Sequence, residues 1–459
     1  MPEQRKAAVR VGTTGYRQLA ATAAPVVRPA VIVVLLLVSA GLLYEANRAA
    51  HEGTGHGWFA AVAISGLFVV RGLHLCRPVT VQHVVVAVLM LGCANVAYRA
   101  EHAAAGFVFL AATGYMLMLP RGSRPQPEAR LRVADLVCRT EGDPLAAFAL
   151  HSAKSYFFGA NTAAALGYRT RFGIAVVAGD PIGARPAFPA LITEFSRFAA
   201  DQGWRVAVLG ASPEVVELWQ RHAGDHRGLR AVPIGRDVVI EVDGFAMVGR
   251  EFRNLRQAVS RTANAGVTTE ILPESALPAP LRAELLDIVD QWGAGRQNRG
   301  FSMILDHLLD GRHPGMLVIV ARDTDGRVAG FQRYGMSARG TELSLDVPWR
   351  RKDAPNGLDE RMIVDLVEYA RTTGITRVSL AFAAFPELFA DKNRTRVGEL
   401  TYRVVHLGDP LIRLESLYRF LRKFHALADE RFVLIRFREL VPAASALLTL
   451  EFFPHRKQY

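Results

Sequence analysis

Apolar residues are distributed very unevenly along this chain of 459 residues. Within the first 120 residues they form four runs with almost no charge, at 29–44, 57–70, 78–98 and 103–120. The last two approach the roughly 20 residues that an α-helix needs to cross a bilayer. The first two are shorter and rely on flanking arginines that reach the membrane surface. The pattern predicts a four-helix transmembrane region over residues 28–120, rather than a buried helical core.

Basic residues favour one side of these runs. The segment before the first run, the turn after the second and the segment after the fourth are rich in arginine, whereas the opposite loops offer only Arg48 and Arg99. Loops rich in Lys and Arg stay in the cytoplasm. We therefore expect a multi-pass protein of the cell membrane, with a basic tail at 1–27 and both termini in the cytoplasm. A linker rich in Pro and Arg would follow at 121–133.

The rest of the chain alternates between strand-like and helix-like patterns, and two stretches resemble each other. Residues 172–210 and 342–383 both read as an apolar strand, an Asp followed within two residues by Pro, a Gly-containing loop, an amphipathic helix and a strand beginning Arg-Val. Gly203 and Gly374 stand where a helix C-cap is expected. The pattern predicts two strand–helix–strand units, which we interpret as an internal duplication.

The net charge and the positions of cysteine and histidine limit which partners and which metal sites are expected. A net charge of +12 favours an anionic partner, such as phospholipid headgroups, nucleic acid or a phosphorylated substrate. Cys76, Cys93 and Cys138 are far apart, and the thirteen histidines form no HxxxH or HExxH motif. We therefore expect neither a disulfide framework nor a metal site.

The stretch "GREFRNLRQAVSRTANAG" at 249–266 predicts an amphipathic helix. Arg250, Arg253, Gln257 and Arg261 fall on one stripe at 100° per residue, with apolar residues opposite. A basic stripe can bind the phosphates of tRNA or lipid. The alternative is an ordinary solvated face, and the absence of acidic residues after Glu251 favours phosphate binding.

The stretch "LDVPWRRKDAPNG" at 345–357 combines an acid with three basic residues. We expect the strand to end at Asp346, at the mouth of a cleft, and a helix to begin after Gly357. Arg350, Arg351 and Lys352 would add charge to the helix N-terminus, which itself attracts anions. Asp346 could hold an amine or act as a general base, or could be a turn residue. Asp180, at the same place in the first repeat, is expected to be structural.

Two segments near the end of the chain have open interpretations. "SLAFAAF" at 379–385 suits a buried central strand or the apolar wall of a tunnel. The amphipathic segment 411–427 could lie on the membrane surface or dock on the core.

The strand–loop–helix–strand units resemble the core of the GNAT acetyltransferase fold, but they lack its coenzyme A loop, so no cofactor is expected. Residues 134–456 as a whole resemble the catalytic domain of the aminoacyl-phosphatidylglycerol synthases, also called lysylphosphatidylglycerol synthetases or multiple peptide resistance factors. The resemblance is carried by "GDPIG", "FRNLRQAVSRTANAG", "RGFSM", "LDVPWRRKDAPNG", "SLAFAAF", "YRFLRKF" and "ERF", in this order. It implies a transmembrane α-helical region followed by α/β tandem GNAT-like domains, at 134–275 and 276–459.

The resemblance also implies an activity. A membrane-bound aminoacyltransferase would move an aminoacyl group, with lysyl as the expected one, from aminoacyl-tRNA to phosphatidylglycerol, which changes the surface charge of the membrane and confers resistance to antimicrobial peptides. The alternatives are a tandem-GNAT transferase with another acceptor, and a non-catalytic membrane-associated binding protein of the same fold.

Site residues follow from these patterns. The expected catalytic residues are Asp346 and Arg350. The family pattern Asp-x-x-Arg is altered, because Trp349 stands at its last position and arginine comes one residue later. The residues expected to bind phosphate of tRNA or lipid are Arg253, Arg256, Arg261, Arg299, Arg351, Lys352, Lys392, Arg394, Lys423 and Arg431.

Overall fold

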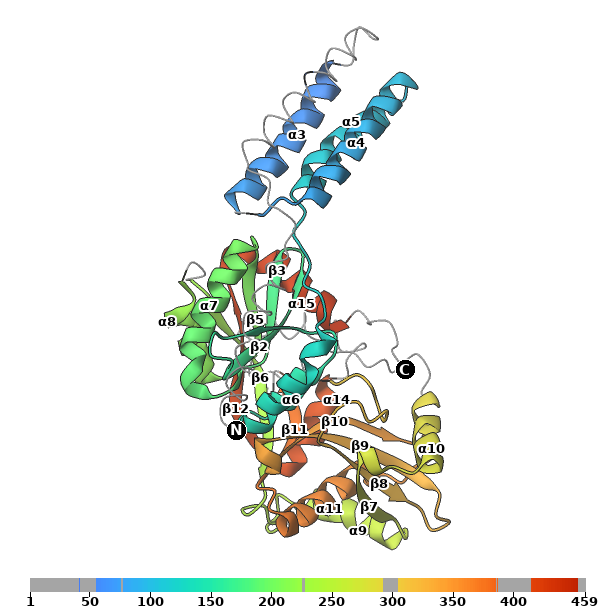
Figure 1. The fold of residues 1–459 in the computed structure, drawn as a ribbon. Coiled ribbons are helices and arrows are strands. Elements are labelled where there is room, and N and C mark those ends of the chain that lie inside the picture. The colour runs from blue at the N-terminus through green and yellow to red at the C-terminus, as the bar shows by residue number, and fades with distance from the viewer. Residues whose placement is uncertain are drawn as a thin grey trace, which may run out of the picture. The chain divides into compact units, whose positions relative to one another are not determined.

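A computed structural model of the chain describes Gly41 and residues 55–75, 77–224, 228–291, 304–384, 386 and 414–452. The chain divides into two compact units. One contains Met1–Arg121 with Phe198–Trp204, and the other contains Gly122–Arg197 with Arg205–Tyr459. Figure 1 shows the helices of the first unit and the mixed sheet and helices of the second.

The N-terminal unit contains three described helices, α3 (Gly55–His74), α4 (Val81–Arg99) and α5 (Ala103–Leu117). Two stretches, Gly57–His74 and Val81–Arg99, are long and apolar enough to cross a membrane, whereas α5 is shorter. The run at 29–44 lies outside the described residues, apart from Gly41. Four spans and their orientation therefore stay predictions.

The second unit begins with the predicted linker, which is already helical from Pro127 in η1 (Pro127–Ala129) and α6 (Arg130–Arg139). The linker prediction to residue 133 was therefore too long, because Val133, Leu136 and Val137 of α6 are buried in the core. An extended segment does not bury one side in this periodic way.

Both predicted strand–helix–strand units are confirmed. The first consists of β3 (Ile174–Ala178), α7 (Phe188–Asp201) and β5 (Arg205–Ala211), and the second of β10 (Glu342–Arg350), α11 (Leu358–Thr373) and β11 (Arg377–Ala384). The two strands of each unit pair in parallel. Gly203 and Gly374 have φ values of 67° and 77°, which suit the predicted helix C-caps.

The remaining elements extend these units. In chain order they are β1 (Ser155–Phe158), β2 (Ala164–Arg171), β4 (Ile182–Gly183), α8 (Pro213–His222), β6 (Arg230–Glu241), α9 (Arg253–Asn264), β7 (Thr268–Pro273), α10 (Ala279–Asp290), β8 (Met316–Arg322), β9 (Val328–Ser337), α14 (Leu414–Leu421), β12 (Leu427–Ile435) and α15 (Leu440–Phe452).

All described strands belong to one sheet, in the order β1-β2-β3-β5-β12-β6-β11-β10-β9-β8-β7, with β4 paired to β2. The C-terminal strand β12 lies between β5 and β6 and is antiparallel to both. It therefore completes the half of the sheet that contains β3 and β5, the strands of the first strand–helix–strand unit (Figure 1). A linear division at residue 275 does not describe this pairing, because the last strand returns to the first half.

Alternation along β8 shows how the second half is layered. Leu317, Ile319 and Ala321 pack with α9 and α11 in one core cluster. Val318 and Val320 face the other way and pack with α10. Successive strand residues point to opposite faces, so β8 is buried by helices on both sides.

Two predictions about the end of the chain are decided by packing. The segment around α14 docks on the core, because Tyr418, Leu421 and Phe424 belong to the same buried cluster as α11. Residues 379–384 of the "SLAFAAF" stretch form part of the strand β11, where Leu380 and Ala383 are buried, and Phe385 lies outside the described residues.

The prediction that the strand ends at Asp346 was wrong. β10 continues to Arg350, and Asp346 lies inside it at an irregularity between Leu345 and Val347. The predicted turn into the next helix is confirmed, since Gly357 is the N-cap of α11 with a φ of 100°.

Candidate active site

A cavity of about 300 Å³ lies beside the central strands β12, β6 and β11. This volume is at the lower end of the range for small-molecule sites. Six acidic side chains and three arginines are among its lining residues, which makes its wall predominantly acidic. The acidic ones are Glu141, Asp143, Asp180, Glu214, Asp237 and Asp429.

Arg431 of β12 organises this cavity from within the protein. Its side chain is buried, and its guanidinium donates to Asp237 Oδ2 at 2.7 Å, Asp143 Oδ1 at 2.8 Å and Asp180 Oδ2 at 3.1 Å. It also donates to the carbonyl of Gly210 at 3.1 Å. Arg431 was expected to bind phosphate, but all three guanidinium nitrogens already donate to protein oxygens. Its predicted role in binding phosphate stays untested.

The cluster carries more negative than positive charge. Three carboxylates surround one guanidinium, and Oδ1 of Asp237 is buried with no hydrogen-bond donor among the described residues. Burial raises the pKa of Asp180 and of Asp237 to about 6, although Arg431 opposes the shift. Carboxylates that are desolvated and only partly compensated behave in this way.

The other two arginines of the wall do not remove this excess. Arg185 pairs with Glu214 at 2.7 Å, and Arg377 pairs with Glu241 at 2.9 Å and Glu342 at 3.3 Å. Each is matched by at least one carboxylate of its own. The uncompensated charge is therefore at Arg431, where a bound cation would be stabilised.

Two of the three aspartates lie in separate copies of the tripeptide sequence Gly-Asp-Pro. Gly142-Asp143-Pro144 and Gly179-Asp180-Pro181 each place an Asp after a glycine in the left-handed region, with φ values of 73° and 75°. Sequence reasoning noted only the second copy and missed both Asp143 and Asp237. The repeated tripeptide was the available signal for Asp143, whereas Asp237 sits in an ordinary strand pattern.

Asp346 lies in a second buried polar centre. Its carboxylate is fully enclosed, accepts from the backbone N–H of Leu305 at 2.7 Å and pairs with Arg333 at 2.9 Å. Arg333 also pairs with the buried Glu274 at 2.5 Å. Burial raises the pKa of Asp346, against the opposing charge of Arg333. Asp346 does not line the cavity around Arg431, and its catalytic role stays a prediction.

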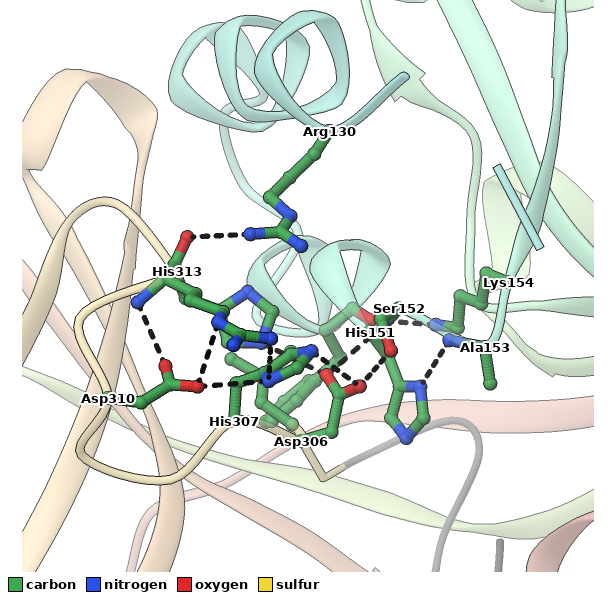
Figure 2. Close-up of polar contacts among 12 residues, drawn as sticks. Arg130, His151, Ser152, Ala153, Lys154, Asp306, His307, Asp310 and His313 are labelled. Atoms are coloured by element: carbon green, nitrogen blue, oxygen red, sulfur yellow. Dashed lines mark hydrogen bonds and ion pairs between the residues drawn. The ribbon is translucent and has the colours of Figure 1, made fainter. Parts of the chain in front are cut away.

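The centre around Asp346 holds the loop that follows β7 and α10, at residues 304–313. Arg333 donates to the carbonyl of His307 at 3.0 Å, beside the bond from Leu305 to Asp346. In the same loop Asp306 accepts from the N–H of Ser152 at 3.1 Å and contacts His313 Nε2 at 3.0 Å, as Figure 2 shows. The loop is therefore fixed to the segment before β1 as well as to β9 and β10.

Asp306 is the centre of the cluster in Figure 2. Burial alone would raise its pKa, but hydrogen bonds from His313 and Ser152 and the nearby His151 hold the pKa well below its usual range. Beside it, burial lowers the pKa of Lys154 to about 8, and this amine donates to the carbonyl of Phe148 at 2.7 Å. These contacts stabilise the loop. Among the described residues, no group of His, Cys, Asp or Glu could hold a metal ion.

The two arginines that follow Asp346 are engaged in ion pairs. Arg350 lies 3.7 Å from Asp359, and Arg351 pairs with Asp287 at 3.0 Å. Lys352 is exposed. Further along, Lys423 pairs with Glu360 at 2.6 Å. Their predicted phosphate contacts are untested, and the remaining predicted residues, Arg299, Lys392 and Arg394, lie outside the described residues.

The predicted amphipathic helix is confirmed as α9. Arg253 and Arg261 are exposed on one side, and Leu255, Ala258 and Thr262 are buried on the other. Arg256 is half-buried and donates to the carbonyl of Met247 at 2.7 Å. The exposed stripe is available to a partner, and its binding to phosphate stays a prediction.

Comparison with known proteins gives a consistent family. The model for "Phosphatidylglycerol lysyltransferase, C-terminal" matches residues 134–435. The chain is 47% identical over 402 residues to the MprF-like domain protein Rv1619 of Mycobacterium tuberculosis, covering 87% of this chain and 83% of that protein. It is 33% identical over 317 residues to the lysylphosphatidylglycerol biosynthesis bifunctional protein LysX of Nocardia farcinica, covering 68% of this chain but only 28% of LysX.

Solved structures share the fold. The structure of L-PGS from Bacillus licheniformis matches with a TM-score of 0.61 and 20% identity, over 74% of this chain and 99% of that one. The C-terminal domain of a putative lysylphosphatidylglycerol synthetase from Agrobacterium fabrum matches with a TM-score of 0.60 and 24% identity, over 72% and 98%. The chain belongs to the phosphatidylglycerol lysyltransferase C-terminal family, and thus to a family of aminoacyltransferases.

Proposed function

We propose that the protein transfers an aminoacyl group, preferably lysyl, from aminoacyl-tRNA to the glycerol headgroup of phosphatidylglycerol. The product carries added positive charge, so the surface of the membrane becomes less anionic, which lowers its attraction for cationic antimicrobial peptides. The observation that carries this proposal is the surplus of carboxylate around Arg431, in a cavity of a chain that belongs to this family.

An aminoacyl group presents a cation that suits this cavity. The α-ammonium of any aminoacyl ester, and the second ammonium of a lysyl group, needs carboxylate or carbonyl acceptors when it leaves water. Oδ1 of Asp237 is buried without a donor, and two of the three aspartates around Arg431 are only partly compensated. A bound ammonium would supply the missing donor and positive charge.

The reaction exchanges one ester for another. The lipid hydroxyl oxygen bonds to the aminoacyl carbonyl carbon, the bond from that carbon to the tRNA ribose oxygen breaks, and the proton of the hydroxyl passes to the ribose oxygen. The exchange is nearly balanced in energy, so catalysis needs proximity and stabilisation of the developing oxyanion. In this proposal the aspartates around Arg431 hold the amine and orient the carbonyl for attack.

Asp346 and Arg350 keep a place in the proposal. Asp346 is enclosed between Arg333 and the N–H of Leu305, which favours a positioning role through the loop at 304–313. Arg350 has a partly exposed side chain near Asp359, from where it could contact lipid or tRNA phosphate. The altered family position, Trp349, is buried in the core beside Val347 and Phe331.

The two macromolecular substrates would approach different parts of the chain. The exposed arginines of α9 suit tRNA phosphates, because arginines that neutralise phosphates release the counterions condensed on the nucleic acid, and α9 itself contains no acidic residue. The apolar helices α3 and α4 would keep the enzyme at the bilayer that contains the acceptor. A tRNA donor requires the catalytic unit to lie in the cytoplasm, as the arginine asymmetry predicts.

Lipid extracts test this proposal. A host that contains phosphatidylglycerol and expresses the full chain should accumulate a new ninhydrin-positive lipid that migrates as a cation. Release of lysine on mild alkaline treatment would identify the transferred group. An unchanged lipid profile, with the protein present in the membrane fraction, would contradict the proposal.

A further inference from the structure

A rim of exposed apolar and basic side chains lies at one end of the sheet. Phe437 and Val441 expose 79% and 76% of their surface, and Phe172 and Leu440 are exposed as well. Exposed apolar side chains that are gathered in one patch mark an interaction surface, whereas singly scattered ones are ordinary. We refer to this group, with the basic residues Arg171, Arg230 and Arg438, as the aromatic rim.

The members of the rim are brought together by strand ends. The N–H of Arg205, at the start of β5, donates to the carbonyl of Gly173 at 3.0 Å, so the β2–β3 turn with Phe172 lies beside it. Arg205 also lies 3.9 Å from Glu439, next to Phe437 and Leu440. Ile435 at the end of β12 is paired with Arg230. These contacts hold the turn, the start of α15 and the start of β6 at the same end of the sheet.

The charge of the rim is positive. Arg171, Arg230 and Arg438 are exposed, whereas the neighbouring acid, Glu439, is buried and lies 3.9 Å from both Arg205 and Arg436. The guanidinium of Arg171 lies over the ring of Phe172, 5.1 Å from its centre. Aromatic rings and arginines together suit the interface of a bilayer, where the rings enter the headgroup layer and the arginines meet lipid phosphates.

The connection of the chain to its apolar helices leads to the same place. Ser123, which follows the last residue of α5 by six positions, exchanges hydrogen bonds with Thr170 in β2. Thr170 is two residues before Phe172. Six residues of extended chain span at most about 20 Å. The length of this connection therefore allows the rim to contact a bilayer that contains α3 and α4. A soluble partner has no such covalent connection and would depend on its affinity for the rim alone.

We propose that the aromatic rim docks on the surface of the bilayer and binds anionic phospholipid headgroups there. Phe172, Phe437 and Val441 enter the interfacial layer, and Arg171, Arg230 and Arg438 bind lipid phosphate. Docking does not depend on the transferase proposal, because it is a property of the surface and is measured without aminoacyl-tRNA.

The test uses the full chain in nanodiscs of phosphatidylglycerol or phosphatidylcholine. Cys76, Cys93 and Cys138 are replaced by Ser, and Phe437→Cys carries a polarity-sensitive bimane label. Asp325→Cys, in the exposed turn between β8 and β9, is the matched control. We expect emission at shorter wavelength for the label at 437 in phosphatidylglycerol discs, and no change at 325.

Charge reversal and exchange provide independent readouts. Arg171→Glu with Arg438→Glu should weaken docking by at least about fivefold per arginine, and should remove the difference between the two lipids. In the chain with its native cysteines, hydrogen exchange at residues 437–441 should be slower in phosphatidylglycerol discs than in phosphatidylcholine discs. This measurement covers the case in which the cysteine-free variant does not fold.

Two results would overturn the proposal. One is a label at 437 that reports water in both lipids, together with equal hydrogen exchange. The other is a shift that appears in detergent without lipid and grows with protein concentration, because a second copy of the chain would then be the occupant of the rim.

Discussion

Arg431 is the side chain that organises the candidate site, because it holds three carboxylates together. Asp143, Asp180 and Asp237 come from three separate segments, and the guanidinium offsets part of the cost of burying their carboxylates together. Even with it, the pKa of Asp180 and of Asp237 is raised to about 6. The cluster is therefore both a structural junction and an incompletely neutralised acid site.

Replacing Arg431 by Met should destabilise the protein strongly at neutral pH. Removing one partner of a buried ion pair costs about 3–5 kcal/mol, and here three carboxylates lose the same partner. Thermal denaturation of the full chain in detergent at pH 8 should show a markedly lower Tm. Arg221→Met, at an exposed pair on α8, is the matched control and should leave Tm unchanged.

The deficit of Arg431→Met should shrink as the pH is lowered. Asp180 and Asp237 have folded pKa values above the unfolded value of 3.8, so the folded state binds more protons than the unfolded state between about pH 4 and pH 6. Their contribution to the free energy of unfolding therefore grows as pH falls through this window, and loss of Arg431 raises both pKa values further. A deficit that stays constant from pH 8 to pH 5 would contradict this reading of the cluster.

At the scale of elements, the sequence predicted the helices and strands of the two repeated units well, and predicted the residues at which strands end less well. Period 2 and period 3.6 identified the two strand–helix–strand units, and glycines marked the ends of α7 and α11. The end of β10 was misplaced, since Asp346 was expected to end the strand, whereas β10 continues to Arg350. A buried Asp inside a strand depends on a partner such as Arg333, which local pattern cannot reveal.

Asp346→Asn separates positioning from catalysis. The variant keeps an acceptor for the N–H of Leu305 but leaves Arg333 with Glu274 as its one charged partner among the described residues, so we expect a loss of about 2–4 kcal/mol in the free energy of unfolding. Activity should recover when the temperature is lowered enough to restore folding. A variant with unchanged Tm and about a hundredfold lower activity would instead support a catalytic carboxylate. Asp353→Asn, at an exposed pair, is the control.

Helix α9 allows a test of tRNA binding. Arg253→Ala with Arg261→Ala removes two exposed charges and leaves the buried side of the helix intact, so folding should be preserved. The logarithm of the tRNA association constant, plotted against the logarithm of salt concentration, should lose a slope of about 1 per arginine. Arg139→Ala with Arg221→Ala is a charge-matched control on other helices. Equal slopes for the two double variants would return α9 to a simple solvated face.

At the scale of the whole molecule, what the sequence could not predict was long-range strand order. β12 joins β5 to β6, and its Arg431 contacts Asp143, which is 288 residues earlier. Neither the pairing nor the cavity beside it follows from local periodicity, because both arise when distant segments meet. By contrast, the family could be recognised from the order of its motifs along the chain. This recognition does not require knowing which of the motifs are in contact in the fold.

Topology is the whole-molecule prediction that matters most for the donor. The arginine asymmetry of the first 132 residues predicts that the catalytic unit lies in the cytoplasm. Reporter fusions after Arg132 should be active only for a cytoplasmic reporter. A signal from the other side of the membrane would contradict the orientation and exclude tRNA as the donor in the cell.

The claim that the carboxylates around Arg431 hold the aminoacyl ammonium is tested by transfer kinetics with Asp237→Asn. The full chain in phosphatidylglycerol vesicles is given lysyl-tRNA, or the same donor with its amines acetylated. Loss of one charge-assisted contact should lower kcat/KM for lysyl-tRNA about 10- to 100-fold, whereas Asp325→Asn should have no effect. Acetylation should reduce transfer by the unmodified protein but cost Asp237→Asn little more, because the two changes remove the same interaction. Equal rates for Asp237→Asn and Asp325→Asn, or unimpaired use of the acetylated donor, would contradict the claim.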